Sequence, residues 1–193
     1  MRKYMYVFAV TLLLGSAMMF GQEKIVVEGD KEVLYLDLSD PSGWNQRDGM
    51  EISASELKCP PCSGDKKTVP AVMMHLDYAK IQGTFPRMHT EPAVVDFSEW
   101  EQVEFMAYVK STRPNMPTRP VEVGFGKSGE LAESKIVFPK KEVWQKVVVT
   151  VESMGEKAKN VERIMFGCEK GKYKKGDVTD FHFGDFRLVR AKK

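Results

Sequence analysis

Apolar residues alternate with polar ones over most of the C-terminal part of the chain, and this pattern constrains the fold more than any other feature. Period two is typical of a β-strand with one buried face, because successive side chains of a strand point to opposite sides. Gly, Pro, Asp and Asn separate the alternating runs, as they do at turns between strands. The runs here are VEVGFG (121–126), KIVFPKKEVWQKVVVTVES (135–153), VERIMFG (161–167) and FHFGDFRLVR (181–190).

The same alternation is found upstream, so strands are expected along the whole chain. A long loop carrying CPPC, the segment GTFPRMHTEP and the proline-rich STRPNMPTRP interrupt it. The one window with a helical pattern, 153–161, is too short and too close to glycine for a core helix. The sequence therefore predicts an all-β antiparallel sandwich. The upstream strand-like runs are 24–29, 32–39, 50–53, 71–80 and 93–111.

The N-terminus has the layout of a secretory signal peptide. Arg2 and Lys3 precede an apolar run from Tyr4 to Leu14, and small residues follow it. The run is shorter than the roughly 20 residues that a spanning helix needs. We therefore expect residues 1–21 to be a signal peptide, residues 22–193 to form one β-sandwich domain, and the mature protein to be secreted or periplasmic with no membrane span.

The charge of the chain argues against a nucleic-acid-binding protein. Without Arg2 and Lys3, 27 basic residues stand against 27 acidic ones. A protein that follows a polyanionic backbone carries a clear basic excess. No nucleic-acid partner is expected.

Cys59, Cys62 and Cys168 leave several arrangements open. In an oxidising compartment Cys59 and Cys62 can bridge, or either can pair with Cys168. A redox dithiol needs CxxC at the start of a helix, whereas here two prolines fill the motif and loop residues follow. Zinc would need a histidine as the fourth ligand, and a single CxxC pair is a weak signal for it.

The alternation also predicts which side chains face outward. In 103–110 the apolar set Val103, Phe105, Ala107 and Val109 should face the core. By the same rule Met74, Leu76 and Tyr78, then Val121, Val123 and Phe125, and then Val147, Val149 and Val151 should point inward. If the strands are neighbours, the residues left outside form one exposed patch. These are His75, Asp77, Met106, Tyr108 and Glu122.

The order of elements resembles the galactose-binding-like jelly roll, the fold of many secreted carbohydrate-binding modules. The resemblance covers residues 70–190 and, more loosely, 32–44. The family often has paired aspartates in its closing strand, where this chain has Gly184 and Asp185. The segments that carry the resemblance are DFSEWEQVEFMAYVKS (96–111), EVWQKVVVTVES (142–153), VERIMFG (161–167) and FHFGDFRLV (181–189).

The resemblance implies a structural calcium between the first and last strands. Asp37, Ser39, Asp40 and Asp185 are the matching oxygen donors, and calcium prefers such ligands. Aspartate in SDPSG is also what an ordinary turn requires.

The resemblance further implies carbohydrate binding, in which aromatic rings stack on sugar faces and polar groups bond the hydroxyls. Tyr108 lies out of phase with the inward set and is the first candidate platform, while Trp44 lies in a polar loop. Trp100 and Trp144 each lead into a strand, where core packing is favoured. The full predicted ligand-binding set is Tyr108, Glu122, His75, Asp77, Trp44 and Arg87, with His89 beside Arg87 on the rim.

Three functions are compatible with the sequence. The leading hypothesis is a secreted, non-catalytic, lectin-like module that binds a poly- or oligosaccharide. The first alternative is a cell-envelope protein whose sandwich face binds another protein. The second is a jelly-roll polysaccharide lyase or glycoside hydrolase, for which carboxylates or a Tyr/His/Arg set must share one cleft. Exposed strand faces carry such residues routinely, so catalysis is not expected.

Overall fold

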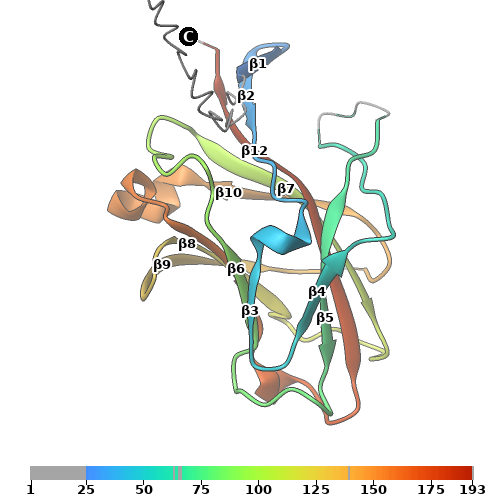
Figure 1. The fold of residues 1–193 in the computed structure, drawn as a ribbon. Coiled ribbons are helices and arrows are strands. Elements are labelled where there is room, and N and C mark those ends of the chain that lie inside the picture. The colour runs from blue at the N-terminus through green and yellow to red at the C-terminus, as the bar shows by residue number, and fades with distance from the viewer. Residues whose placement is uncertain (1–24, 63, 65–66, 139, 193) are drawn as a thin grey trace, which may run out of the picture.

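The computed structural model describes residues 25–62, 64, 67–138 and 140–192, and these form two antiparallel sheets packed face to face. The first, sheet A, has seven strands, with β10, β7 and β12 side by side (Figure 1). Its strands are β1 (Ile25–Glu28), β2 (Lys31–Tyr35), β4 (Glu51–Ala54), β5 (Ala71–Asp77), β7 (Gln102–Ser111), β10 (Gln145–Thr150) and β12 (Val178–Ala191).

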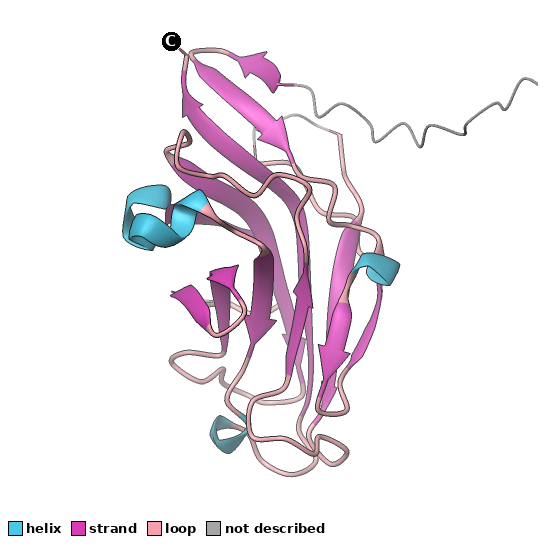
Figure 2. Cartoon of the chain, turned by 60° about the vertical axis from the view of Figure 1, so that its left-hand side comes forward, coloured by secondary structure: helices cyan, strands magenta, loops and turns pink. Residues whose placement is uncertain are grey.

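Sheet B has five strands in the order β3-β6-β11-β8-β9. Strands make up most of the regular secondary structure of the described residues, and the helical segments are short and peripheral (Figure 2). The predicted all-β jelly-roll sandwich is confirmed. The sheet B strands are β3 (Asn45–Arg47), β6 (Arg87–Thr90), β8 (Val121–Lys127), β9 (Glu130–Ile136) and β11 (Arg163–Gly167), and the 3₁₀ helices are η1 (Pro41–Gly43), η2 (Val151–Lys159) and η3 (Lys170–Lys172).

Strand β12 organises sheet A. On one side it pairs with β7 along most of its length, and on the other it pairs first with β5 and then with β2. The register shifts between Gly184 and Arg187, and Asp185 has a positive φ of 52°. Such a bulge changes which side chains face the core. Phe183 and Phe186 are consequently both buried, although three positions separate them.

The core lies between the sheets and is rich in aromatic rings. Phe166 of sheet B stacks on Phe183 of sheet A, with ring centroids 3.9 Å apart. Phe105 meets the Phe166 ring edge-on at 5.6 Å. The inward faces predicted for β5, β7 and β8 are confirmed, since their apolar sets are all buried. The inward set of β10 also faces the core, with Val149 and Val151 buried and Val147 packed against them.

Two segments differ from the sequence expectation. Residues 87–90 were expected in a loop but form β6, between β3 and β11 in sheet B. The run is only four residues long and follows a proline, so its alternation is too short to detect. Residues 151–159 form η2, which was not expected, and bury Met154 and Ala158 against the core.

Candidate functional site

A loop crosses the outer face of sheet A and divides it into two hollows. The loop connects β4 to β5, and Cys59 and Val69 pair within it through backbone hydrogen bonds of 3.1 and 2.9 Å. The Cys59 sulfur lies close over Gly184, where an added Cβ would be 2.7 Å from it. Met106 is buried beneath the same loop. On either side of the loop, the outer face of sheet A is left uncovered.

The first hollow, here called the aromatic hollow, has a volume of about 430 Å³. Strand register explains how it forms, because Met73, His182 and Tyr108 are direct cross-strand neighbours on β5, β12 and β7. The next row contains Asp180 and Lys110. Its lining residues include Met73, Tyr108, Lys110, Glu142, Asp180 and His182.

Tyr108 is half-buried and held from two sides. Its ring centroid lies 5.3 Å from that of Trp144 at 47°, and 5.3 Å from that of His182 at 81°. Burial and the nearby Glu142 carboxylate raise the pKa of Tyr108, which keeps its hydroxyl protonated at neutral pH. The ring is therefore a pre-positioned, neutral platform. Trp144 supports it from the outer face, so the prediction that Trp144 packs in the core is wrong.

His182 is buried at the floor of the aromatic hollow. Its Nδ1 lies 2.8 Å from the Ser55 hydroxyl, which anchors the crossing loop to the sheet. Burial lowers the pKa of His182, and the Lys110 charge acts in the same direction while Asp180 opposes both. The imidazole is thus neutral in the folded protein at pH 7.

We expect acidification below about pH 6.5 to destabilise the protein through His182 and His89, since burial lowers the pKa of both. Their unfolded forms take up protons first, so the stability present above the unfolded pKa of about 6.5 is lost as the pH falls. The slope is at most about 1.4 kcal/mol per pH unit for each group. Urea unfolding of the wild type and His182→Gln at several pH values checks this. An identical pH dependence in both proteins would contradict it.

His75 lies on the same face, one row from Tyr108. Its Nδ1 is 2.6 Å from Asp180, a residue that lines the aromatic hollow. Asp77 lies at the end of β5, where it accepts a hydrogen bond from the Ala79 amide and pairs with Lys80 at 3.3 Å. The structure therefore places His75 on the same face of sheet A as Tyr108 but with β12 between their strands, whereas Asp77 stabilises the turn after β5.

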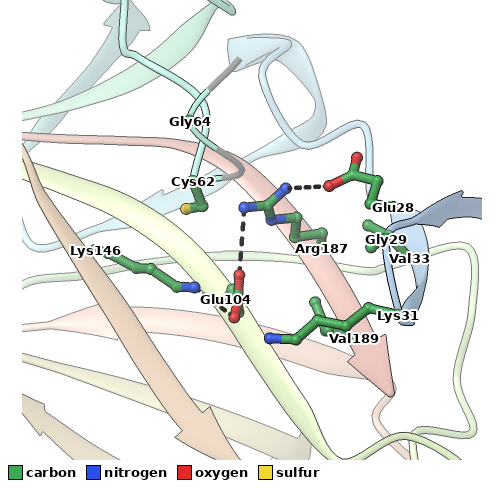
Figure 3. Close-up of a pocket in the computed structure, with 10 residues that line it drawn as sticks. All are labelled: Glu28, Gly29, Lys31, Val33, Cys62, Gly64, Glu104, Lys146, Arg187 and Val189. Atoms are coloured by element: carbon green, nitrogen blue, oxygen red, sulfur yellow. Dashed lines mark ion pairs between the residues drawn. The ribbon is translucent and has the colours of Figure 1, made fainter. Parts of the chain in front are cut away.

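The second hollow, here called the charged hollow, has a volume of about 680 Å³ (Figure 3). Arg187 lies at its base and is only 2% exposed. Its Nη2 is 3.3 Å from Glu104, and its Nη1 is 3.5 Å from Glu28. Glu104 also pairs with Lys146 at 2.6 Å, while Lys31 reaches into the hollow from β2. Cations and carboxylates alternate, so charges here are largely compensated.

Asp185 completes this network beneath the crossing loop. It accepts a hydrogen bond from the Cys62 amide and lies 3.8 Å from Arg187 Nη2. Among the described residues, the Nε and Nη1 of Arg187 and the Oδ1 of Asp185 have no hydrogen-bond partner. The network ties the loop, β7 and β12 together.

Comparison with solved structures shows which fold this is. A family 11 carbohydrate-binding module from Clostridium thermocellum, solved in complex with a β-1,3-1,4-mixed-linked tetrasaccharide, matches with a TM-score of 0.52 and 12% identity. The match covers 83% of this chain and 97% of the module. The β-sandwich fold is similar to that of this module. At this identity the likeness concerns the fold alone.

The same module-like fold occurs in a longer chain, an exo-β-agarase, with a TM-score of 0.56 and 10% identity. That match covers 83% of this chain but only 25% of the agarase, so this chain spans about a quarter of that enzyme. No protein-family model matches the sequence, and no curated protein matches it. Among the described residues, no helix is long and apolar enough to cross a membrane.

The structure separates the predicted ligand-binding residues. Glu122 and Arg87 lie on sheet B, in the layer opposite Tyr108, so the single patch expected from the alternation does not exist. Trp44 is 7% exposed, and its Nε1 donates to the Leu38 carbonyl at 2.9 Å. Trp44 is therefore a core residue. The prediction that it binds a ligand rested on its polar loop and is wrong. Trp100 is buried as expected.

Of the predicted calcium ligands, Asp37, Ser39 and Asp185 line one hollow of about 240 Å³, whereas Asp40 lines another. Asp40 accepts a hydrogen bond from the Ser42 amide and caps η1, and Asp37 accepts one from Ser39. Asp185 faces Arg187 and the Cys62 amide. Among the described residues, no three His, Cys, Asp or Glu side chains lie together as a metal site requires.

The three cysteines are free thiols, and they lie in two separate places. Cys59 and Cys62 belong to the crossing loop on the outer face of sheet A. Cys168 is in the core, 3.2 Å from the Tyr78 hydroxyl. Pairing of Cys168 with either loop cysteine does not occur in this fold. Burial raises the pKa of Cys59 and Cys62 to about 12, which disfavours the thiolate that redox chemistry or zinc binding would use.

Proposed function

We propose that this chain is a secreted, non-catalytic carbohydrate-binding module that holds a poly- or oligosaccharide in the aromatic hollow of sheet A. The observation that carries the proposal is the braced, half-buried Tyr108 ring at the edge of an open hollow. Sugars present apolar ring faces that an aromatic side chain covers, together with hydroxyls that need hydrogen-bond partners. Lys110, Glu142 and Asp180 supply those partners around the ring.

Rigidity of the platform supports binding. Trp144 and His182 fix the Tyr108 ring, so little side-chain freedom is lost when a ligand covers it. The likeness of the fold to a module solved in complex with a tetrasaccharide supports the same ligand class. Export through residues 1–21, which lie outside the described residues, would bring the module to extracellular glycans.

The chemistry of the carboxylates supports binding rather than catalysis. Glu104 is a buried carboxylate of the open face, and Arg187, Lys146 and Gln102 all contact it. Both oxygens of this carboxylate are engaged by these neighbours, so it is poorly placed to exchange a proton with a leaving group.

We expect Tyr108→Ala to weaken glycan binding about thirtyfold, because removal of a central aromatic anchor costs about 2 kcal/mol. Binding of the mature protein to an array of plant, algal and host polysaccharides identifies the ligand class, and calorimetry with a positive glycan gives the affinity. Tyr108→Phe keeps the ring and should bind nearly as well as the wild type. Glu122→Ala, in the opposite layer, should leave this affinity unchanged.

A folded wild-type protein that binds no glycan on the array would overturn the proposal and favour a protein partner in the cell envelope. Equal affinity of Tyr108→Ala and the wild type would place the site elsewhere on the molecule. Release of reducing sugar from a bound polysaccharide would contradict the non-catalytic part.

A further inference from the structure

Three arginines gather on the outer face of sheet B. Arg47 of β3 and Arg87 of β6 are direct cross-strand partners. Arg163 of β11 lies on the same face, two positions along the strand from Met165, which is the cross-strand partner of His89. The arginine patch is defined here as Arg47, Arg87 and Arg163 around His89.

These arginines differ in their pairing from Arg113, Arg187 and Arg190, although the exposed Arg119 also forms no ion pair among the described residues. Arg113, Arg187 and Arg190 each form ion pairs with carboxylates. Within the part of the chain that the structure describes, no member of the arginine patch does so. The side chain of Arg163 only donates to the Ser128 hydroxyl at 3.0 Å.

The arrangement is electrostatically unfavourable without a ligand. Like charges directly opposite one another on neighbouring strands destabilise a sheet. Their effect on the centre of the patch is visible in His89, whose pKa is lowered first by burial and then by Arg163, Arg47 and Arg87. Glu91 is the carboxylate that opposes them, and it acts more weakly on His89 than the arginines do.

An apolar ring lies beside these charges. Phe85 packs over Gly167, because an added Cβ at Gly167 would overlap its ring. Gly167 is the cross-strand partner of Arg87 on one side and of Glu122 on the other. An aromatic ring therefore lies over the same row of the sheet that contains Arg47 and Arg87.

We propose that the arginine patch binds the carboxylate groups of an acidic polysaccharide. The guanidinium fork matches a carboxylate with two parallel hydrogen bonds. The arginines come from three strands about 4.8 Å apart, a spread that suits repeated charges along a polymer better than one small anion. Phe85 provides the surface on which a sugar ring of that polymer rests.

This site is independent of the proposed function, because it lies in the sheet opposite the aromatic hollow. Each site has its own loss-of-binding variant, so failure of one proposal leaves the other standing. Neutral glycan binding should depend on Tyr108 and acidic glycan binding on Arg87.

The test compares polygalacturonate with its fully methyl-esterified form, which has the same backbone without the charges. The mature protein is expected to bind polygalacturonate or alginate and to lose at least about tenfold in affinity for the ester. Added salt should weaken binding to the acidic polymer, because exposed charges are screened. Equal affinity for the ester, or no binding to either polyuronate, would overturn the proposal. Binding to dextran sulfate alone would overturn the choice of carboxylate.

The variant Arg47→Gln/Arg87→Gln should lose at least about tenfold in affinity for the bound polyuronate. A matched control, Arg119→Gln/Lys175→Gln, removes the same charge away from the patch and should bind like the wild type. Equal losses in both variants would show a non-specific charge effect and would count against the site.

His89 provides a readout that a merely structural arginine cluster would not change. A carboxylate bound between Arg47, Arg87 and Arg163 offsets their charge, so the pKa of His89 should rise when polyuronate is present. An NMR titration of the imidazole, with short oligogalacturonate as the probe, measures this. An unchanged titration under saturating oligomer would place the bound anion outside the patch.

Discussion

Replacing Arg187 with leucine is expected to lower the free energy of unfolding by about 3–5 kcal/mol, because it leaves buried carboxylates without their cation. Arg187 is 2% exposed and lies 3.3 Å from Glu104 and 3.8 Å from Asp185. Glu104 would keep Lys146, but Asp185 would keep only the Cys62 amide. The expected loss is therefore dominated by Asp185 and by release of the crossing loop.

Equilibrium unfolding in guanidinium chloride, followed by tryptophan fluorescence, measures this loss. Arg190→Leu is the matched control on the same strand, since Arg190 pairs with Glu32 and with the exposed Glu99. Solvent screens the Glu99 pair, and the Glu32 pair is less buried than the network of Arg187, so the control should lose less. The loss in unfolding free energy for Arg187→Lys should lie between those of Arg187→Leu and Arg190→Leu, because one ammonium cannot replace the guanidinium fork. Similar losses in Arg187→Leu and Arg190→Leu would contradict a buried network.

The inward faces of the strands could be predicted from the sequence. The alternation in 103–110 predicts correctly that Phe105 and Val109 are buried and that Tyr108 points outward. This succeeds because an antiparallel strand with one face on the core has a strict period of two. The outward position of the candidate platform could therefore be predicted from the sequence.

What covers an outward face could not be predicted in the same way. Glu104 and Met106 alternate with core residues as Tyr108 does, yet both are buried, Met106 beneath the crossing loop and Glu104 in the network with Arg187. The position of that loop depends on tertiary contacts, such as that of Cys59 with Gly184. Sequence periodicity carries no information on such contacts. The charged hollow was missed for this reason.

The bulge in β12 was a second obstacle. A regular strand from Phe181 would place Asp185 and Arg187 on the core face, together with Phe183. The register shift after Gly184 turns them outward and brings Phe186 inward instead. A bulge inserts one residue without a distinctive sequence signal, so the role of Arg187 could not be found from the pattern.

The division of strands between the two sheets was a third obstacle to predicting the site. Glu122 and Tyr108 were placed in one patch because both point outward, but β8 and β7 belong to opposite sheets. Alternation gives the face of a strand and says nothing about its neighbours. Arg47 and Arg163 were not predicted as site residues, because only the strand pairing places them near Arg87 and His89.

The second large effect is expected at Phe166, where the two sheets meet. Phe166→Ala should lower the free energy of unfolding by about 3–5 kcal/mol, the usual cost of removing a fully buried phenylalanine ring. The ring is fully buried and stacks on Phe183, with Phe105 edge-on against it. The ring centroid of Trp44 lies 5.8 Å from that of Phe166 in the same cluster. Removing this ring leaves a cavity between the two sheets at their most aromatic contact.

Thermal unfolding should show a fall in melting temperature of about 6–20 °C for Phe166→Ala in a domain of this size. Phe166→Leu fills most of the cavity and should cost less than about 2 kcal/mol. Val148→Ala, at a position 47% exposed, serves as the surface control and should change little. Because Tyr108 lies on the outer face, the folded fraction of Phe166→Ala should still bind glycan. A melting temperature within a few degrees of the wild type would show that Phe166 does not hold the sheets together.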